Sequence, residues 1–311
     1  MPVADGELRL GLQEVLRRPV RSVVRRAHPY GSSHTIEDVD VTFDEGPPLA
    51  LVFKDVWAPE AHAAAAKPAS MRDPDREIEA YREVLEPGGL DVPACYGALS
   101  APGRRWLFLE AVDGIPLWQT GASVTWQAAA RWLAGLHAQP VPTRSAHLLA
   151  YDAVHLHGWL RRALTLTPPG ALDEVAAVWA RVVQRLVEWP QSVVHGDFHP
   201  SNILVQGAAG SPRIRPVDWE LAGVGPGLLD LAALTSGSWS AAARQQVVLA
   251  YRGALPPAWR PDPADLLDAL AHCRLFVAVQ WLGWSADWSP PTEHAHDWLA
   301  EASALARELT P

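Results

Sequence analysis

Two neighbouring segments carry the polar side chains that most constrain this chain. The stretch His195–Asn202 reads HGDFHPSN and places a carboxylate at Asp197 and an amide at Asn202, five residues further on. A second carboxylate, Asp218, lies on a short apolar segment, within the sequence VDWE. A Gly-Asp or Asp-Trp pair by itself usually marks only a turn or the end of a strand. Here apolar runs lead into and out of the first stretch, so the pattern predicts a strand, a polar loop and a second strand.

The spacing from Asp197 to Asn202 is that of the protein-kinase catalytic loop, in which the Asp accepts the proton of the attacking hydroxyl and the Asn helps to hold magnesium. In that template a later Asp at a strand end, here Asp218, binds the metal that bridges the nucleotide phosphates. The chain has His-Gly-Asp instead of His-Arg-Asp, and Asp-Trp-Glu instead of Asp-Phe-Gly. These variants resemble the aminoglycoside phosphotransferase and choline kinase families, which share the protein-kinase fold but phosphorylate small molecules.

The resemblance implies a bilobal α+β fold of the protein-kinase type. Residues 1–110 would form a nucleotide-binding lobe with an antiparallel sheet and a helix, and residues 111–311 a mostly helical catalytic and substrate-binding lobe. Period-two patterns predict strands, and helical spacing of apolar residues predicts helices. The predicted strands are 21–26, 39–43, 49–53 and 106–109, with a turn at 93–97. The predicted helices are 7–15, 76–85, 125–137, 151–164, 172–188, 241–251, 265–283 and 292–309.

Lys54 follows the apolar strand 49–53, where a lysine is usually only a solvated charge. By resemblance it matches the third-strand lysine that contacts the nucleotide phosphates. That role requires a carboxylate to fix the ammonium group, and the amphipathic helix after it offers several. Glu77 fits the family segment best, while Glu79 and Glu83 are alternatives that favour the solvated face.

The loop expected to cover the phosphates departs from the protein-kinase pattern. It has one glycine, Gly31, where protein kinases carry GxGxxG. As a motif it is no better than an ordinary turn. Because of its position, the backbone amides and hydroxyls of Ser32 and Ser33 are predicted to donate hydrogen bonds to phosphate oxygens.

The segment from Glu110 to Gly114 resembles an interlobe hinge, which Gly114 and Pro116 would interrupt. In kinases the hinge presents backbone groups to the base, so Glu110 and Val112 are predicted to contact the nucleotide there. Residues of any type can serve in this way. The sequence therefore predicts ATP as the donor and leaves GTP as an alternative.

Only about eleven residues separate Asp218 from Asp230, and no Ala-Pro-Glu follows. A protein kinase needs a long activation segment here to bind a polypeptide, so the short segment favours a small-molecule acceptor. Asp230 is interpreted either as a helix cap or, by resemblance, as a buried carboxylate that braces the catalytic loop. The HGDFHPSN stretch is especially similar to the family branch that acts on macrolides and other hydroxylated natural products.

For three histidines near these motifs, a role in packing or in holding the loop is weighed against a role in catalysis or phosphate binding. His137 ends a predicted helix and is expected to lie in the core. His195 is expected to anchor the loop instead of acting as a base. His199 takes the place of a catalytic-loop lysine of protein kinases, and both a phosphate contact and a plain loop role stay open for it.

Tryptophans and acidic residues crowd the segment 281–298. The tryptophans could form a cage for a quaternary ammonium group through cation–π attraction, a stacking wall for a sugar, or part of the core, which helical spacing favours. The acidic residues could receive the ammonium groups of an aminoglycoside or form a solvated surface. The residues concerned are Trp281, Trp284, Trp288 and Trp298, with Asp287, Glu293 and Asp297.

Composition narrows the partners. With 49% hydrophobic residues and a net charge of -9, the chain of 311 residues is globular and lacks a basic stripe, so nucleic acid is not expected as a partner. Its two cysteines, Cys95 and Cys273, have no CxxC or metal-binding spacing, so a disulfide scaffold is not expected. The predicted location is therefore the reducing cytoplasm. The N-terminus lacks the apolar core of a signal peptide, and the apolar run 275–284 is too short to span a bilayer, so no membrane association is expected. The oligomeric state cannot be predicted.

The sequence therefore predicts an ATP-dependent small-molecule kinase with Mg²⁺ as its metal. Asp197 would orient and deprotonate the acceptor hydroxyl, and Asn202 and Asp218 would hold magnesium. Lys54, steadied by Glu77, would fix the nucleotide. The acceptor would be a hydroxyl of an antibiotic, sugar or amino alcohol. The alternative, favoured by the single-glycine loop, is a pseudokinase that binds nucleotide or ligand without turnover.

Overall fold

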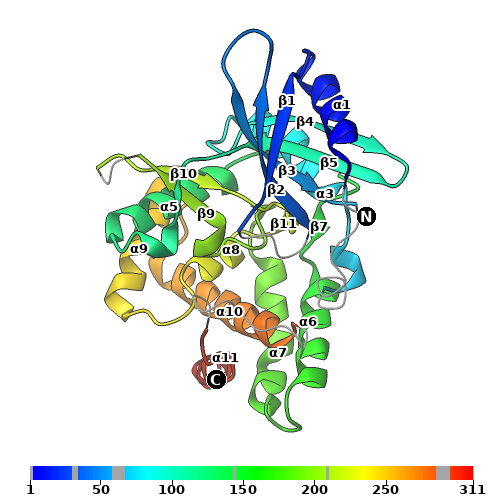
Figure 1. Cartoon of the computed structure of the whole chain (residues 1–311). Coiled ribbons are helices and arrows are strands. Elements are labelled where there is room, and N and C mark those ends of the chain that lie inside the picture. Colours follow the sequence, from blue (N-terminus) through cyan, green and yellow to red (C-terminus); the bar gives the residue numbers. More distant parts are fainter. Residues whose placement is uncertain are drawn as a thin grey trace.

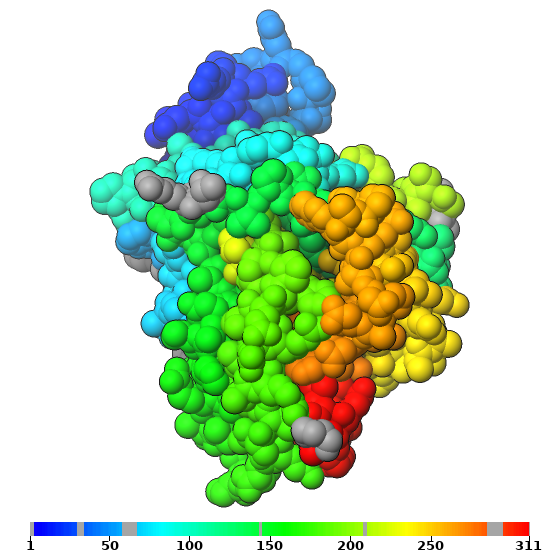
Figure 2. All heavy atoms as spheres, turned by 180° about the vertical axis from the view of Figure 1, so that it is seen from behind, coloured from blue at the N-terminus to red at the C-terminus, as the bar shows by residue number. Residues whose placement is uncertain are grey.

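The computed structural model describes residues 3–29, 34–57, 67–142, 145–207, 210–284 and 295–310. They form an N-terminal part built on an antiparallel sheet and a larger, mostly helical C-terminal part (Figure 1). Figure 2 shows the same division from behind, with the blue and cyan N-terminal segments above the green, orange and red C-terminal helices. The α+β architecture predicted from the sequence is confirmed.

Five antiparallel strands form the N-terminal sheet, in the order β1-β2-β3-β5-β4. Their bounds are β1 Ser22–Ala27, β2 Thr35–Thr42, β3 Leu49–Asp55, β4 Cys95–Ala101 and β5 Arg104–Glu110. Side chains alternate between the two faces, and one face buries Val41 and Phe53. Helix α1 (Asp5–Leu16) covers this face with Leu8 and Leu12, which belong to the same apolar cluster.

Strand β4 differs from the prediction, which placed a turn at 93–97. The strand begins at Cys95, and its register with β5 shifts between Cys95 and Gly97, which has a φ of 143°. Pairing with the buried strand β5 thus overrides the local turn signal. In addition, β2 begins at Thr35, earlier than predicted, and β3 is long enough to include Lys54.

The predicted amphipathic helix is one continuous segment of three pieces. It runs through α3 (Arg76–Ala80), a π-helical turn (Tyr81–Leu85) and α4 (Glu86–Gly88). It ends at Gly89, whose φ of 60° is left-handed, as is common at helix C-termini. The predicted apolar stripe is buried: Ile78, Tyr81 and Leu85.

Helices dominate the C-terminal part. They are α5 Ser123–His137, α6 Ala153–Leu166, α7 Asp173–Glu188, α8 Leu228–Leu234, α9 Ala241–Ala254, α10 Pro263–Leu282 and α11 Trp298–Glu308. Helix α10 packs against α6, α7, α8 and α11, and every residue from Leu275 to Gln280 is buried, as expected of a helix in a core. Short 3₁₀ turns are η1 Ala69–Met71, η3 Leu117–Gln119, η4 Pro200–Asn202 and η5 Pro257–Trp259. Among the described helices, none combines the length and apolar content that a membrane crossing requires.

Two small sheets position the segments singled out in the sequence. Their orders are β10-β9-β6 and β7-β11-β8. Their strands are β6 Ile115–Pro116, β7 Leu149–Ala150, β8 Gln191–Val194, β9 Ile203–Gln206, β10 Arg213–Pro216 and β11 Gly223–Pro226. The loop 195–202 therefore joins β8 to β9, as the strand–loop–strand pattern predicts. Strand β6 follows the segment 110–114 and pairs with β9, so this segment is joined directly to the loop-bearing sheet.

Candidate active site

The backbone of the loop 195–202 is held by one buried carboxylate. Asp230, on α8, accepts hydrogen bonds from the backbone N–H groups of His195 at 2.7 Å and Gly196 at 2.9 Å. His137 Nε2 lies 3.3 Å from the same carboxylate. Asp230 is thus the brace that the family resemblance implies and does not act as a helix cap. His137 is buried and lies in the core, as predicted.

Gly196 is required by the packing of the loop. Its φ of 81° is left-handed, which an L side chain rarely adopts. A Cβ at this position would come within 2.0 Å of the Tyr151 hydroxyl oxygen and 2.3 Å of the Leu221 carbonyl oxygen. The loop backbone therefore passes closely over the segments that follow β7 and precede β11.

His195 is an anchor of the loop, as predicted. Its ring is fully buried, Nδ1 accepts a hydrogen bond from the N–H of Asp197 at 3.2 Å, and Nε2 lies 3.0 Å from the Val217 carbonyl oxygen. This pattern fits the neutral tautomer with its proton on Nε2. Burial lowers the pKa of His195, which favours the same neutral form. The ring therefore connects the loop to the segment that precedes Asp218.

Asp197 and Asn202 are joined side chain to side chain. Asn202 Nδ2 donates to Asp197 Oδ2 at 2.8 Å and to the Asp197 carbonyl oxygen at 3.0 Å. The side chain of Asp197 is 33% exposed. The partial burial of the carboxyl group removes water from it, and this desolvation is the main cause that raises the pKa of Asp197 to about 7. The negative charges of Asp218 and Glu220 raise this pKa further. Near neutral pH such a group is present in both its ionised form, which can accept a proton, and its protonated form.

Lys54 links two carboxylates from different parts of the chain. Its Nζ lies 2.7 Å from Glu77 Oε1 and 3.1 Å from Asp218 Oδ1, and its side chain is 7% exposed. Burial alone would lower the pKa of Lys54, but the charges of Asp218 and Glu77 outweigh it and raise this pKa above its usual range. Of the three candidate partners on the helix, Glu77 is the one in contact, whereas Glu79 pairs with Arg82.

A cavity of about 350 Å³ lies between the N-terminal sheet and the loop-bearing sheet. One end is formed by the segment from Glu110 to Val112, and the other by Lys54, Asn202 and Asp218. The lining between these ends is largely apolar and includes Ile36, Val52, Leu109, Leu204 and Val217. A cavity with apolar side chains beside the charged groups of Lys54 and Asp218 suits a nucleotide.

The structure thus brings five predicted residues to one cavity: Lys54, Glu110, Val112, Asn202 and Asp218. Glu77 contacts Lys54 but does not line the cavity, and Asp197 borders it through Asn202. The side chain of Glu110 points elsewhere, because it binds Arg215 and accepts from the N–H of Ala94 at 3.0 Å. Ser32 and Ser33 lie outside the described residues.

Arg76 has a role at this site that the sequence did not reveal. Its buried guanidinium donates to four carbonyl oxygens, those of Met71, Glu220 and His147 at 2.8 to 2.9 Å and that of Ser70 at 3.1 Å. These carbonyls come from both parts of the molecule. Nothing in the local sequence signals such partners, although Arg76 directly precedes Glu77.

Lys67 and Glu220 form a second ion pair that the sequence did not indicate. His34 Nε2 lies 3.6 Å from the other carboxylate oxygen of Glu220. Burial alone would raise the pKa of Glu220, but the charge of Lys67 outweighs it and holds this pKa well below its usual range. The only available sequence signal was the place of Glu220 in VDWE, two residues after Asp218.

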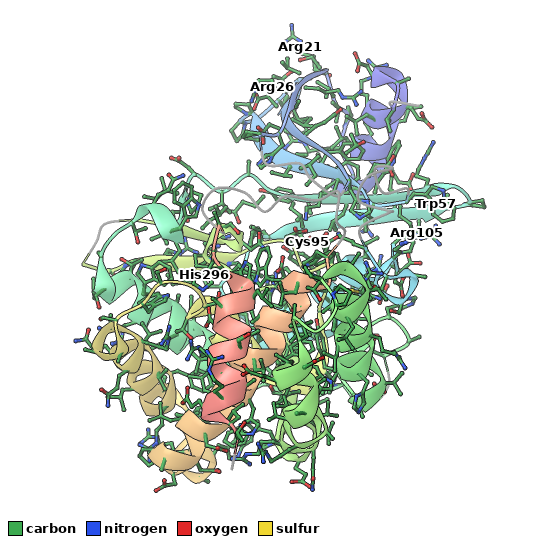
Figure 3. All side chains as sticks on the ribbon, turned by 90° about the horizontal axis from the view of Figure 1, so that it is seen from below. Arg21, Arg26, Trp57, Cys95, Arg105 and His296 are labelled. Atoms are coloured by element: carbon green, nitrogen blue, oxygen red, sulfur yellow. The ribbon has the colours of Figure 1, made fainter. Side chains whose placement is uncertain are left out.

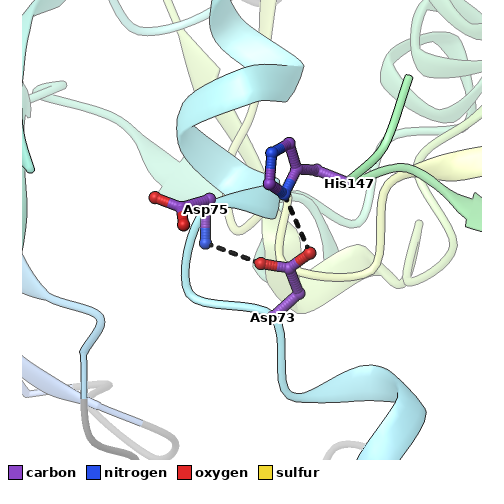
Figure 4. A group of neighbouring side chains, drawn as sticks. All are labelled: Asp73, Asp75 and His147. Atoms are coloured by element: carbon purple, nitrogen blue, oxygen red, sulfur yellow. Dashed lines mark hydrogen bonds and ion pairs between the residues drawn. The ribbon is translucent and has the colours of Figure 1, made fainter. Parts of the chain in front are cut away.

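Asp73, Asp75 and His147 form a small polar cluster whose potential metal-binding atoms lie within 4.8 Å of one another (Figure 4). Asp73 Oδ2 is 3.0 Å from His147 Nδ1, and Asp73 Oδ1 accepts from the N–H of Asp75. Asp75 Oδ1 also accepts from Arg105 Nε at 2.5 Å. Because these contacts use the carboxylates and bring in a guanidinium, the cluster ties the start of α3 to the segment before β7.

The tryptophans near the C-terminus pack among themselves and against the loop. Trp281 stacks on Trp298 with ring centroids 5.1 Å apart and meets the His199 ring edge-on at 5.1 Å. Trp284 packs on Trp159 at 5.3 Å.

Of the three acidic residues singled out in this segment, Asp297 has a structural role, because it caps α11 by accepting a hydrogen bond from the N–H of Ala300. The other two, Asp287 and Glu293, lie outside the described residues, as does Trp288.

His199 is buried beside the catalytic carboxylate candidate. Its Nε2 lies 3.6 Å from Asp197 Oδ1, and its ring contacts Trp281. The histidine therefore connects the loop to the start of the C-terminal tryptophan group. Both roles predicted for it are compatible with this position.

The sequence from residue 40 to 272 matches the family model described as the phosphotransferase enzyme family, APH. Since the match spans more than half of the chain, this protein belongs to that phosphotransferase family, and the predicted family resemblance is confirmed. No curated protein sequence matches the chain.

Solved structures with the same fold include three small-molecule kinases. The GDP complex of aminoglycoside 2'-phosphotransferase-IIIa has 16% identity and a TM-score of 0.61, and the match covers 99% of this chain and 98% of that one. Spectinomycin phosphotransferase with ADP and spectinomycin has 12% identity, a TM-score of 0.57 and 99% coverage of both chains. A choline kinase from Streptococcus pneumoniae has 15% identity, a TM-score of 0.61 and 98% coverage of both. At these identities the likeness establishes the kinase-like fold.

Proposed function

We propose that this protein is a small-molecule kinase that transfers the γ-phosphoryl group of ATP to a hydroxyl of its acceptor. The observation that carries the proposal is the convergence of Lys54, Asn202 and Asp218 at one end of the cavity, with Asp197 bound to Asn202. The proposal divides the chain into a nucleotide-binding lobe, residues 1–110, and a catalytic and substrate-binding lobe, residues 111–311. The segment 110–114 joins them.

The nucleotide is proposed to lie along the cavity. Its base would meet the backbone at Glu110 and Val112, and its phosphates would lie at Lys54, whose ammonium is fixed by Glu77. The backbone amides and hydroxyls of Ser32 and Ser33 stay predicted donors of hydrogen bonds to the phosphate oxygens. ATP is the proposed donor, with GTP as the alternative, because the structures of similar fold include an ADP complex and a GDP complex.

The side chains at the charged end fit a magnesium ion. Asn202 uses its amide N–H groups to bind Asp197, which leaves its oxygen for a metal. Asp218 supplies a carboxylate, and Mg²⁺ prefers oxygen ligands of these kinds. When bound, the ion would neutralise negative charge on the nucleotide phosphates. Asn202 and Asp218 are therefore the proposed ligands.

Phosphoryl transfer depends mainly on positioning and charge, and little on covalent help from the protein. Asp197 would accept a hydrogen bond from the acceptor hydroxyl and take its proton as the new O–P bond forms and the bond to the leaving diphosphate breaks. Its pKa of about 7 is suited to such a transfer. Lys54 and Asp218 would hold the phosphate end in line.

The acceptor is proposed to be a hydroxyl of an antibiotic, a sugar or an amino alcohol. Proteins of similar fold are named as an aminoglycoside phosphotransferase, a spectinomycin phosphotransferase and a choline kinase. In this chain His199 lies beside Asp197, and its ring contacts Trp281. Aromatic side chains near Asp197 would favour an acceptor with an apolar or cationic face. A cytoplasmic location stays a prediction from the cysteine content.

The proposed function is tested by turnover. The protein is mixed with Mg²⁺ and ATP or GTP and a panel of aminoglycosides, macrolides, choline and sugars, and formation of the nucleoside diphosphate is followed. We expect acceptor-dependent turnover that falls at least about 100-fold in Asp197→Asn. Asp262→Asn, which keeps a capping side chain at the start of α10, is the matched control and should retain full activity.

Two results would contradict the proposal. Turnover by Asp197→Asn at the rate of the unchanged protein would remove Asp197 from the mechanism. Tight binding of nucleotide without diphosphate formation on any acceptor would favour the alternative, a pseudokinase that binds nucleotide or ligand.

A further inference from the structure

Lys67, from the N-terminal part, forms an ion pair with Glu220, from the C-terminal part. Glu220 lies two residues after Asp218 in the sequence. The Lys67 side chain is 10% exposed and that of Glu220 14% exposed. A largely buried pair of this kind is unlike a solvated surface pair, since removal of one partner leaves an uncompensated charge inside the protein. The pair therefore ties two chain segments to a defined relative position.

The backbone of Lys67 is itself held in place by hydrogen bonds from a neighbouring side chain. Its carbonyl oxygen accepts from the Arg72 guanidinium, at 2.9 Å from Nε and 2.6 Å from Nη2. Arg76 then donates from one nitrogen, Nη1, to the carbonyl oxygens of both Met71 and Glu220. The turn that carries Lys67 is thus bonded to Glu220 twice, through the Lys67 ammonium and through Arg76.

The residue that this arrangement supports is Asp218. Its φ of 68° is left-handed, a conformation that costs free energy for a residue other than glycine and persists only when its surroundings hold it. On its N-terminal side, the N–H of Val217 donates to the Asn202 carbonyl oxygen at 2.9 Å. On its C-terminal side, Glu220 is held by Lys67 and Arg76.

A small pocket lies beside this ion pair. A cavity of about 30 Å³ beside the pair is lined by His34, Lys67, Glu77 and Glu220 among others. Its volume is on the order of that of a single water molecule. Because Lys67 holds the side chain of Glu220 and Arg76 holds its carbonyl oxygen, a shift of Glu220 would be transmitted along the backbone to Asp218.

We propose that Lys67 is a positioning residue for the proposed phosphoryl transfer, acting through Glu220 to fix the strained backbone that directs Asp218 toward the metal and the nucleotide. Lys67 itself contacts neither the nucleotide nor the acceptor in this proposal. It rests on the proposed function, because there Asp218 is assigned to magnesium. Residues that orient a metal ligand in this way typically contribute 10- to 100-fold to metal affinity, as an order of magnitude.

Calorimetric binding of ATP, with Mg²⁺ and then with EDTA, tests this role without an acceptor. In Lys67→Met we expect the Mg²⁺-dependent gain in ATP affinity to fall about tenfold, while ATP affinity in EDTA stays within about twofold. A general structural defect would lower both affinities together. Lys67→Arg, which keeps the charge, should retain most of the gain.

Two further variants define the path of the effect. In Lys67→Met/Glu220→Gln, we expect no larger loss than in Lys67→Met alone, because Lys67 acts through Glu220. Arg105→Met is the matched control. Arg105 pairs with Asp75 at the start of α3 and lies beside Trp57 on the N-terminal part (Figure 3), without contact to the segment 218–220. It should show the full Mg²⁺-dependent gain.

The outcomes separate this inference from the proposed function. If Lys67→Met keeps the full gain while the unchanged protein turns over an acceptor, the positioning role is wrong and the kinase assignment stands. A further, additive loss in the double variant would mean that Lys67 acts on the nucleotide directly, which also overturns the inference. If the unchanged protein binds no nucleotide under either condition, both proposals fall.

Discussion

Burial and the neighbouring carboxylates of Asp218 and Glu220 raise the pKa of Asp197 to about 7. Only the ionised carboxylate can accept the proton of an acceptor hydroxyl. We therefore expect kcat/KM for the nucleotide, which reports the free protein, to rise about tenfold per pH unit below about pH 7 and to level off above it. A profile from about pH 5 to about pH 9 measures this.

The nucleotide's own phosphate also titrates in this range, so its affinity is measured at each pH and its contribution removed. A profile that stays flat down to about pH 5 would show that Asp197 is ionised throughout and would contradict the expectation. Asp197→Asn should retain no such limb in its residual activity.

At the same scale, the site divides into residues that the sequence could predict and residues that it could not. The loop 195–202 and Asp218 could be predicted, because their spacing within apolar runs is local information. Lys67 and Arg76 could not, because their partners are Glu220 and carbonyls that lie far away in the sequence. Their importance arises only when folding buries them beside those partners.

At the scale of elements, helices were predicted better than strands. Helix α10 carries a long apolar pattern of its own, and its bounds differ by one or two residues from the prediction. Strand β4 has no such pattern, since Gly97 interrupts it and its stability comes from pairing with β5. The bend at Gly97 is visible as a turn signal, but the sequence does not show that a strand continues through it.

The close packing of the loop 195–202 at Gly196 predicts how much stability a larger residue there would cost. Gly196→Ala would place a methyl group against Tyr151 and Leu221 at a left-handed φ, so we expect it to lower the free energy of unfolding by at least about 3 kcal/mol. Gly237→Ala is the matched control, because Gly237 has a φ of 84° but open space around a Cβ. It should cost only about 1 kcal/mol.

Urea unfolding of the two variants and the unchanged protein measures both free energies. If Gly196→Ala and Gly237→Ala lower the free energy of unfolding equally, backbone strain at a left-handed φ accounts for the whole effect. The close approach of the loop to Tyr151 and Leu221 would then contribute nothing to stability.

At the scale of the whole molecule, the junction between the N-terminal and C-terminal parts is tied at several points. Lys54 binds Asp218, Lys67 binds Glu220, and Asp73 contacts His147. Arg76 adds hydrogen bonds to carbonyls on the C-terminal side (Figure 4 shows the adjacent cluster). With the start of α3 bonded to the other part in this way, Glu77 is held beside Lys54.

The same ties should make the two parts unfold together. In Arg76→Met the carbonyls of His147 and Glu220 lose a buried, charged donor, so we expect the free energy of unfolding to fall by at least about 3 kcal/mol. Arg82→Met is the matched control on the same helix: Arg82 forms an exposed pair with Glu79, and its loss should cost less than about 0.5 kcal/mol. Urea unfolding followed by tryptophan fluorescence and by circular dichroism measures both. If Arg76→Met unfolds at the urea midpoint of Arg82→Met, the junction does not couple the two parts through Arg76.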